Sequence, residues 1–434
     1  MTGRIAVIGG GYGGCAAAVE LARRGFAVSL FESSRILGGR ARRVASKYGP
    51  LDNGQHILAG AYTETLRLMR LVGAEPERLL RRLPLTLIVP GEMAIRAPRL
   101  PAPLHLTAAL LAAKGLAWHE RLAAMRLMLA LKLKGFRLDS DESVADLLTR
   151  YRQPERLRRL LWEPLSLATL NTPAKEASAQ VFAHVLRHTL AGDRAASDLL
   201  LPQTDLSALF PEPAAEFLRQ HGSEVHLCHP VRKLEALSEG GFRLAGEGWS
   251  EVFSAVVLAV APYHAHALLP DLPETNSCRT VLGGLSYEPI TTCNLGYEVS
   301  VHLPRPMIGL SGGPGQWLFD RSALVGKSGS IVSAVISGPS SHQDMSREEL
   351  VAALHRQICA AVGPLPAPRW QQIITEKRAT FSCRPNLSRP RMETGLKSLL
   401  LCGDYVDSDY PATLETAVRS GIACGKRLTV VLGS

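Results

Sequence analysis

Glycines and one acidic residue near the start of the chain have the types and spacing of a nucleotide-binding site. Gly9, Gly11 and Gly14 form the pattern GxGxxG, and Glu32 follows 18 residues after the last glycine. Glycine at these positions permits a tight turn and a close approach of the backbone to a pyrophosphate, while an acidic residue at this distance accepts hydrogen bonds from a ribose. These residues therefore predict a dinucleotide site.

A second group of residues with chemical potential follows soon after. Gly38 and Gly39 precede Arg40, and an arginine behind two glycines can contact a diphosphate through two parallel hydrogen bonds. The run Asp52-Asn53-Gly54-Gln55-His56 then offers a carboxylate, two amides and an imidazole within five residues. We expect both segments to lie close to the nucleotide site.

The elements that must position the first group can be read from the same region. Residues 4–8 form a short β-branched run that predicts a strand, and small apolar residues over 15–24 predict a helix whose N-terminus faces the phosphates. A second strand is expected over 27–31, with Glu32 at its end. This frame of strand, turn, helix and strand makes the glycine motif much more specific than the glycines alone.

The C-terminal part of the chain supplies a further carboxylate and a further helix. A short apolar strand over 399–402 is expected to stop at Gly403 and Asp404, and a helix is expected to begin near Pro411. Asp404 can bond the ribityl or pyrophosphate part of a flavin nucleotide. The positive end of the helix, at Thr413 and Leu414, would stabilise negative charge on a reduced flavin ring.

Together these residues resemble the FAD-dependent amine oxidase and phytoene desaturase superfamily, whose pattern is VIGGGxxG, a glutamate, GGR and a late GD before a helix. A closer resemblance is to the squalene-associated FAD-dependent desaturases, understood as hydroxysqualene dehydroxylases. It rests on residues 52–56, 162–173, 199–202 and 403–421. Two residues depart from the pattern: Tyr12 stands where a smaller aliphatic residue is more common, and Tyr405 stands where a tryptophan is more common.

The resemblance implies an α/β fold: a Rossmann-like FAD-binding domain of the amine-oxidase type with an inserted α+β substrate domain. In this interpretation Val231, which follows a proline, packs its backbone against the adenine. The implied FAD domain comprises residues 1–83, 223–285 and 385–434. The implied substrate domain comprises residues 84–222, mainly helical, and 286–384, with a sheet containing strands near 291–299 and 330–336.

The same resemblance implies FAD as the cofactor and a long-chain isoprenoid alcohol as the substrate. The reaction would remove the hydroxyl of hydroxysqualene to give squalene by hydride transfer from reduced FAD, and loss of hydroxide requires an acid. His56 is the first candidate for the acid, with Gln55 or Asn53 positioning the hydroxyl or the flavin edge; a histidine that only bonds the backbone is the alternative. No second nucleotide motif is found, so an external electron donor is expected.

Two other functions fit the same residues. One is an oxidative relative, either a desaturase of carotenoid-type polyenes or an amine oxidase. An amine oxidase usually has a lysine near the flavin; Lys327 and Lys377 are available, but nothing in the sequence places either of them there. The other is a prenyl-binding escort protein without catalytic activity. The intact glycines, Glu32, Arg40 and Asp404 count against an escort, which need not retain the FAD apparatus.

The positive charge of the chain is concentrated in one segment. The chain has 49 basic and 39 acidic residues, a net charge of +10, and residues 96–137 hold eight Lys or Arg and one Glu. Leucine, methionine and tryptophan interrupt these charges, which argues against a nucleic acid partner and predicts docking on an anionic membrane surface. A core helix whose Lys and Arg side chains reach solvent is the alternative.

Other sequence features narrow the expected setting of the protein. The eight cysteines show no CxxC and no spacing typical of metal ligands, so neither a metal site nor disulfides are predicted. No apolar run reaches the roughly 20 residues needed to span a bilayer, and no signal peptide is evident. We therefore expect a cytoplasmic protein at the inner face of the membrane.

Overall fold

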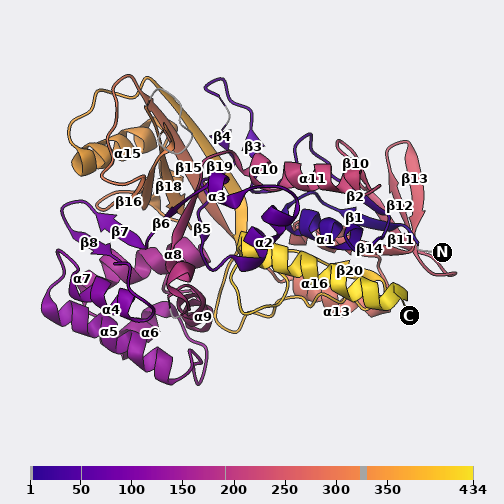
Figure 1. The fold of residues 1–434 in the computed structure, drawn as a ribbon, viewed down its shortest axis with the longest axis horizontal. Helices are drawn as coiled ribbons and strands as arrows, with labels where there is room; N and C mark the ends of the chain where they lie inside the picture. Colours follow the sequence, from indigo (N-terminus) through magenta and orange to yellow (C-terminus); the bar gives the residue numbers. More distant parts are fainter. Residues whose placement is uncertain (1–2, 50, 191, 323–329, 434) are drawn as a thin grey trace.

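The computed structural model describes residues 3–49, 51–190, 192–322 and 330–433 (Figure 1). Its two largest sheets lie in different halves of the molecule along the longest axis. A parallel sheet and the two chain termini occupy one half, and an antiparallel sheet and a group of helices occupy the other (Figure 1). The predicted fold class, α/β with a Rossmann-like unit, is confirmed.

The parallel sheet has five strands taken from three distant parts of the chain. Its order is β10-β2-β1-β14-β20. The four strands other than β10 are short, mainly apolar runs, as expected for strands covered on both faces, whereas the edge strand β10 is Glu-Val-His. The strands are β1 (Ile5–Ile8), β2 (Val28–Phe31), β10 (Glu224–His226), β14 (Ala255–Leu258) and β20 (Leu399–Leu401). β1, β2 and β20 lie within the runs that the sequence predicts as strands.

Apolar clusters cover both faces of this sheet. Ile5 and Val7 face the helices α1 (Tyr12–Ala22), α11 (Pro211–Gln220) and α16 (Leu414–Gly433). Ala6 and Ile8, which alternate with them, belong to a second cluster, to which a three-stranded sheet over residues 233–253 and the helices α12 (Pro262–Leu268) and α13 (Asn276–Gly283) contribute. The two-residue period of a strand thus divides the core into two layers.

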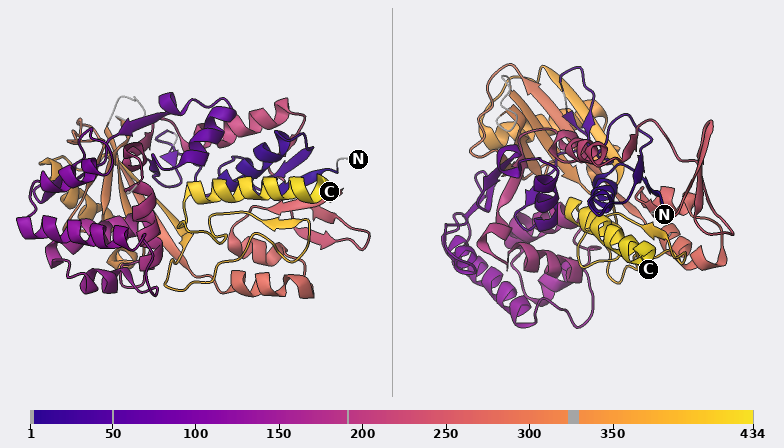
Figure 2. Two further views of the ribbon diagram at one scale, coloured as in Figure 1. Left: turned by 60° about the horizontal axis from the view of Figure 1, so that its bottom comes forward. Right: turned by 45° about the vertical axis from the view of Figure 1, so that its right-hand side comes forward.

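α1 and α16 run side by side with their N-termini at the same end, next to the carboxyl ends of β1 and β20 (Figure 2). Glycine makes this approach possible: a Cβ atom at Gly421 would lie 2.2 Å from the carbonyl oxygen of Gly13. The turn of α16 before that contact brings Ala417 O to 3.0 Å from a Cβ built at Gly13. Two helix N-termini are therefore available at one end of the sheet.

The antiparallel sheet has the order β16-β17-β18-β15-β19. Its strands are β15 (Tyr287–Tyr297), β16 (Met307–Gly309), β17 (Trp317–Asp320), β18 (Ser330–Ser337) and β19 (Trp370–Phe381). One face packs on α15 (Arg347–Val362) through a cluster that includes Leu295 and Leu354. The other face carries Met307, Phe319 and Val335, which contact Leu201.

Residues 84–222 are mainly helical, as expected, but also contain strands. β7 (Thr86–Val89) and β8 (Met93–Arg96) form a hairpin, and β9 (Leu199–Pro202) lies between β5 (Leu58–Ala59) and β6 (Leu80–Leu83). Besides α11, the helices of this part are α4 (Leu104–Leu111), α5 (Trp118–Leu133), α6 (Val144–Arg150), α7 (Glu155–Leu157), α8 (Glu163–Leu170), α9 (Ala179–Thr189) and α10 (Leu206–Leu209), with a π-helical turn, η1 (Arg158–Trp162).

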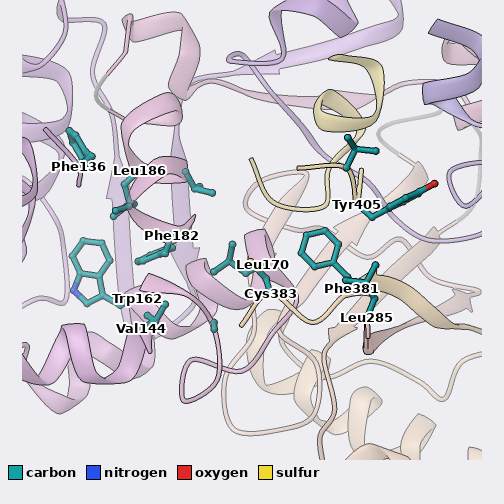
Figure 3. Packing of buried hydrophobic residues seen from close by; sticks show 14 of the residues in the cluster. Phe136, Val144, Trp162, Leu170, Phe182, Leu186, Leu285, Phe381, Cys383 and Tyr405 are labelled. Atoms are coloured by element: carbon teal, nitrogen blue, oxygen red, sulfur yellow. The ribbon is translucent and has the colours of Figure 1, made fainter. Parts of the chain in front are cut away.

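The core of these helices continues toward the C-terminal strands. Figure 3 shows Trp162, Phe182 and Leu170 leading to Phe381 and Tyr405. The remaining elements are short: β3 (Arg43–Val44), β4 (Leu51–Asp52), α2 (Thr63–Leu71), α3 (Pro76–Leu79), β11 (Lys233–Ala236), β12 (Phe242–Gly246), β13 (Trp249–Phe253) and 3-10 turns at Arg194–Ser197, Pro273–Thr275 and Ser341–Asp344. The domain boundaries stay a prediction.

Candidate active site

The turn between β1 and α1 has the geometry of a phosphate cradle. Gly9 has φ +107°, and a Cβ atom there would lie 2.4 Å from Ala259 O; one at Gly14 would lie 1.9 Å from Gly9 O. Gly11 differs, since a Cβ there would meet only the Cα of Gly39, at 3.8 Å. Gly9 and Gly14 therefore allow packing, while Gly11 faces open space at an α1 N-terminus with no side-chain cap. Such a terminus favours an anion.

Glu32 closes the other side of this turn. Its Oε2 accepts a hydrogen bond from Gly10 N at 2.8 Å, and its Oε1 accepts one from Ser34 N at 2.8 Å. Oε1 also accepts from Ser33 Oγ at 3.2 Å. Since each carboxylate oxygen can accept two hydrogen bonds, Oε2 is the oxygen that keeps capacity for a ribose hydroxyl. Val231 lies on the neighbouring segment, where His229 N donates to Glu32 O at 2.9 Å. These contacts fit the expected adenosine end of a dinucleotide.

The second glycine pair lies directly against the first. Gly38 N donates to Gly10 O at 2.8 Å, and a Cβ atom at Gly39 would lie 3.1 Å from the Cα of Gly11. Arg40 extends from this pair, and its Nη2 donates to Asp404 Oδ1 at 2.6 Å. The glycine pair and the arginine thus bound the same space that Gly11 faces.

A single arginine organises the loop that follows Asp404. The guanidinium of Arg389 donates to the backbone carbonyls of five residues and stacks on Phe381, 4.8 Å from the ring centre. The five carbonyls are those of Asp404, Tyr405, Val406, Ser408 and Tyr410. The buried Asp404 is therefore held from both sides, by Arg40 at its carboxylate and by Arg389 at its backbone.

The helix after this loop begins three residues later than expected. α16 starts at Leu414 rather than near Pro411, because Pro411 O accepts from Thr416 Oγ1 at 2.6 Å and Thr413 Oγ1 accepts from Thr416 N at 3.2 Å. Thr413 is thus a cap outside the helix. The buried Glu415 accepts hydrogen bonds from Glu64 N and Thr65 N, at 3.0 and 2.9 Å, and so joins α16 to the N-terminus of α2.

The run from Asp52 to His56 forms a turn beside Arg40. Asn53 Nδ2 donates to Arg40 O at 3.2 Å and to Glu376 Oε2 at 3.3 Å. Gln55 Oε1 accepts from Arg321 Nη1 at 3.1 Å. The structure therefore brings these candidate residues next to the predicted cofactor site.

Asp52 anchors this turn through two hydrogen bonds. Its Oδ1 accepts from Leu206 N at 2.9 Å, and its Oδ2 accepts from Arg321 Nη2 at 3.1 Å, with the two side chains 4% and 5% exposed. Burial raises the pKa of Asp52 to about 6, although the positive charge of Arg321 opposes this rise. The pair fixes the end of β4, from which the turn departs.

His56 bonds the backbone through one ring nitrogen, and its other ring nitrogen has no hydrogen bond to the described part of the chain. Its Nδ1 lies 2.9 Å from Gly54 O, and because a carbonyl only accepts, Nδ1 is the donor. Nε2 is then the nitrogen that can take up or release a proton. Burial lowers the pKa of His56, the hydrogen bond to Gly54 opposes this, and the positive charge of Arg40 lowers it further.

Asn171, within the segment 162–173, and the two tyrosines that depart from the family pattern lie in hydrogen-bonded or closely packed surroundings. Asn171 ends α8 in the left-handed conformation, with φ +49°, and its side chain bonds Thr380 Oγ1 and Gly338 N. Tyr12 is buried and donates to Leu206 O at 2.8 Å. The Tyr405 ring packs on Gly403. Lys377 is exposed on β19, and Lys327 lies outside the described residues.

The segment 96–137 presents an apolar surface. Seven of the ten large apolar side chains exposed within the described ranges belong to it, including Trp118 at 58%, Leu129 at 57% and Leu133 at 79%. α5 also buries an inner stripe of Ala124, Leu127 and Leu131. Among the described residues, no helix combines the length and hydropathy required to cross a bilayer.

Three functional side chains gave no signal in the sequence: Arg321, Arg389 and Glu376. Each reaches the site from a distant part of the chain, and none belongs to a recognisable spacing. No group of three or more His, Cys, Asp or Glu side chains in the described ranges is placed to hold a metal ion.

Comparisons with known proteins agree with this geometry. The family model described as flavin containing amine oxidoreductase matches residues 12–428. The hydroxysqualene dehydroxylase of Sinorhizobium fredii is 31% identical, with 97% of each chain covered. A zeta-carotene desaturase of Zea mays is 24% identical, over 96% of this chain and 82% of that protein. A putative protoporphyrinogen oxidase of Exiguobacterium has a similar structure, with a TM-score of 0.72, 17% identity and 100% of both chains covered.

Proposed function

Because the chain belongs to the flavin containing amine oxidoreductase family, and within it to the hydroxysqualene dehydroxylases, we propose that it removes the hydroxyl group of hydroxysqualene to give squalene. As a member of this family it is an FAD-dependent oxidoreductase. The observation that carries the proposal is similarity over almost the whole chain to a protein of that name. The zeta-carotene desaturases are less similar, so desaturation of a polyene is the weaker alternative.

The residues around the two glycine pairs fit FAD. In the proposed assignment the backbone at Gly11 and Gly39 borders the pyrophosphate, and the uncapped α1 N-terminus stabilises its charge. Gly9 and Gly14 allow the close packing that shapes this turn. FAD, once bound and reduced, supplies the hydride that replaces the hydroxyl.

The assignment for the rest of the cofactor follows the same contacts. Glu32 accepts the ribose hydroxyls, Val231 lies along the adenine, and Arg40 faces the diphosphate. Gly403 and Asp404 lie at the ribityl part, and Thr413 and Leu414 present the α16 N-terminus. This assignment is supported by the free acceptor capacity of Glu32 and by the contact between the two glycine pairs.

His56 is the proposed acid. Its Nε2, free of the hydrogen bond that holds Nδ1, would deliver a proton to the substrate hydroxyl, so that the carbon–oxygen bond breaks and oxygen leaves as water. The neighbouring positive charge of Arg40 makes protonated His56 a stronger acid. Gln55 and Asn53 would orient the hydroxyl or the flavin edge, held in turn by Arg321 and Glu376.

We further propose that residues 96–137 dock on an anionic membrane, which puts the enzyme at the cytoplasmic face where its isoprenoid substrate dissolves. The exposed stripe Leu122, Leu129 and Leu133 on α5 is apolar, and Arg126 and Lys132 lie exposed among it. Glu120, the acidic residue of the segment, is buried and paired with Arg156 at 3.1 Å. The surface is thus apolar and basic, as interfacial helices are.

An anaerobic assay tests the reaction. Photoreduced holoenzyme mixed with hydroxysqualene is expected to regain its oxidised flavin spectrum and to form one squalene per flavin, whereas squalene itself leaves the spectrum unchanged. Absence of reoxidation, with bleaching of the oxidised enzyme by a polyene precursor, would support a desaturase instead. Protein that stays colourless after FAD is added would support an escort. An external reductase, quinone or free flavin is the proposed source of electrons.

A further inference from the structure

A cavity lies beside the antiparallel sheet, outside the site described above. It encloses about 210 Å³ between the β7–β8 hairpin, the turn from η1 to α8, and the β16–β17 connection. Its walls are mostly apolar and include Leu87, Met93, Leu160, Leu165 and Trp317. Sites that enclose a whole drug-sized ligand measure roughly 300–1,000 Å³. The cavity therefore suits one end of a long apolar chain and not a complete C30 isoprenoid.

A buried hydroxyl lies on the same sheet, beside the Asn53–His56 turn. Thr292 of β15 is 2% exposed, and its Oγ1 has no hydrogen-bond partner in the part of the chain that the structure describes. A Cβ atom built at Gly54 would lie 3.9 Å from Thr292 Oγ1 and 3.9 Å from His56 Cε1. The hydroxyl and the imidazole thus flank one point. A buried hydroxyl without a protein partner is unfavourable, so this oxygen is available to a bound molecule.

The register of the sheet connects this hydroxyl to the cavity. Thr292 pairs with Val335 of β18, Val335 pairs with Trp317 of β17, and Trp317 pairs with Gly309 of β16. Residues directly opposite each other point to the same face, and neighbouring strands are about 4.8 Å apart, so the row covers about 10 Å from Thr292 to Trp317. Its surroundings are apolar, because Val335 and Trp317 belong to a cluster that also includes Ile57, which follows His56.

The cavity is also connected to the surface proposed to meet the membrane. Ala94 of β8 exchanges two backbone hydrogen bonds with Lys114, at 3.0 and 2.9 Å, which joins the hairpin to the segment 96–137. At the cavity, Arg159 pairs with Glu92 at 2.8 Å, with its side chain 53% exposed. The row of residues that begins at Thr292 therefore ends close to the segment 96–137, where a substrate dissolved in lipid would arrive.

We infer that this row holds the substrate: Thr292 Oγ1 donates a hydrogen bond to the oxygen of the substrate hydroxyl, and one isoprenoid arm runs over Val335 and Trp317 into the cavity. The inference rests on the proposed function and adds a hydroxyl-recognising residue and the position of one arm. Thr292 contacts the oxygen that leaves, while His56 on the other side of Gly54 supplies the proton. Ile374, the partner of Thr292 on β19, keeps the surroundings of this hydroxyl apolar.

Binding titrations of FAD-loaded, oxidised enzyme, followed by the change in flavin absorbance, test the inference. The probes are hydroxysqualene, squalene and a hydroxysqualene analogue with one arm shortened by two isoprene units. Thr292→Val is expected to weaken hydroxysqualene binding about tenfold and leave squalene binding unchanged, since one hydrogen bond is lost at constant side-chain shape. Thr292→Ser, which keeps the hydroxyl, should bind hydroxysqualene about as tightly as the wild type. Equal effects on hydroxysqualene and squalene, or none, would overturn the role of Thr292.

Leu165→Trp tests the cavity, with Ala168→Trp as a matched control at an exposed position on the same helix. Leu165→Trp is expected to weaken hydroxysqualene binding at least tenfold and to leave the shortened analogue within about twofold. Equal loss for both ligands would overturn the cavity assignment. Flavin content and melting temperature identify variants that have not folded. A wild-type enzyme that fails to form squalene refutes the proposed function, whereas active variants that bind like wild type refute only this inference.

Discussion

Arg40 Nη2 donates a hydrogen bond to Asp404 Oδ1 at 2.6 Å, although the two residues are 364 positions apart in the chain. This ion pair connects the glycine pair that follows β2 to the loop that follows β20. Asp404 is buried and Arg40 is one-third exposed at its side chain, so solvent screens the pair only in part. The protein itself therefore joins the first and last parts of the proposed FAD site through this ion pair.

Replacing Arg40 is expected to weaken FAD binding. Arg40→Gln removes the charge that faces the proposed diphosphate and leaves Asp404 without its ionic partner, and a hydrogen bond to a charged group contributes about 1.5–3 kcal/mol. We expect FAD affinity to fall about 10- to 100-fold, measured by fluorescence titration of the apoprotein. Arg67→Gln, which changes a half-exposed arginine of α2, is the control and should bind FAD normally. Equal affinity in both variants would contradict the assignment of Arg40.

Loss of Arg321 should destabilise the protein in a way that depends on pH. Arg321→Met leaves Asp52 buried without its cation, a defect of about 3–5 kcal/mol. The pKa of Asp52, already about 6, should rise further, and because the ionised form is the one destabilised, the loss should be larger at pH 8 than at pH 5. Urea denaturation of the wild type and the variant at both pH values measures this loss in the free energy of unfolding.

The double variant Asp52→Asn/Arg321→Met is the control for this experiment. Asparagine retains an oxygen that accepts from Leu206 N but carries no charge, so most of the stability at pH 8 should return. Turnover should remain low, because Gln55 also loses its hydrogen bond from Arg321. If Arg321→Met loses the same free energy of unfolding relative to wild type at both pH values, Asp52 is not the group that responds to pH.

The proposed role of His56 predicts the shape of the pH profile. An acid acts only in its protonated form, and burial together with Arg40 lowers the pKa of His56 below the ordinary value of about 6.5. The rate of flavin reoxidation by hydroxysqualene should therefore fall as the pH rises, with the midpoint below 6.5. His56→Gln should retain FAD, react at least 100-fold more slowly and lose this dependence. Full activity of that variant would exclude His56 as the acid.

The difference between what the sequence predicts and what it misses follows from the range of the interactions. Gly9, Gly14 and Glu32 could be predicted because one strand–turn–helix unit determines their separation. Arg321 and Thr292 could not, since their roles depend on a sheet register set by residues far away in the chain. The sequence also does not predict which leucines of α5 are buried. Both faces of this helix are apolar, so only the tertiary structure reveals the buried stripe.

The outward stripe of α5 leads to the last prediction. In the variant Leu122→Gln/Leu129→Gln/Leu133→Gln, each changed side chain is at least 47% exposed, so stability should change little. Binding to anionic liposomes, measured by co-sedimentation, should weaken at least tenfold, because these side chains would enter the acyl boundary. Arg126→Gln/Lys132→Gln should weaken binding to anionic but not to neutral liposomes. Val430→Gln alters a side chain that is 64% exposed outside this surface and should bind like wild type. Unchanged binding of the leucine variant would mean that α5 does not meet the membrane.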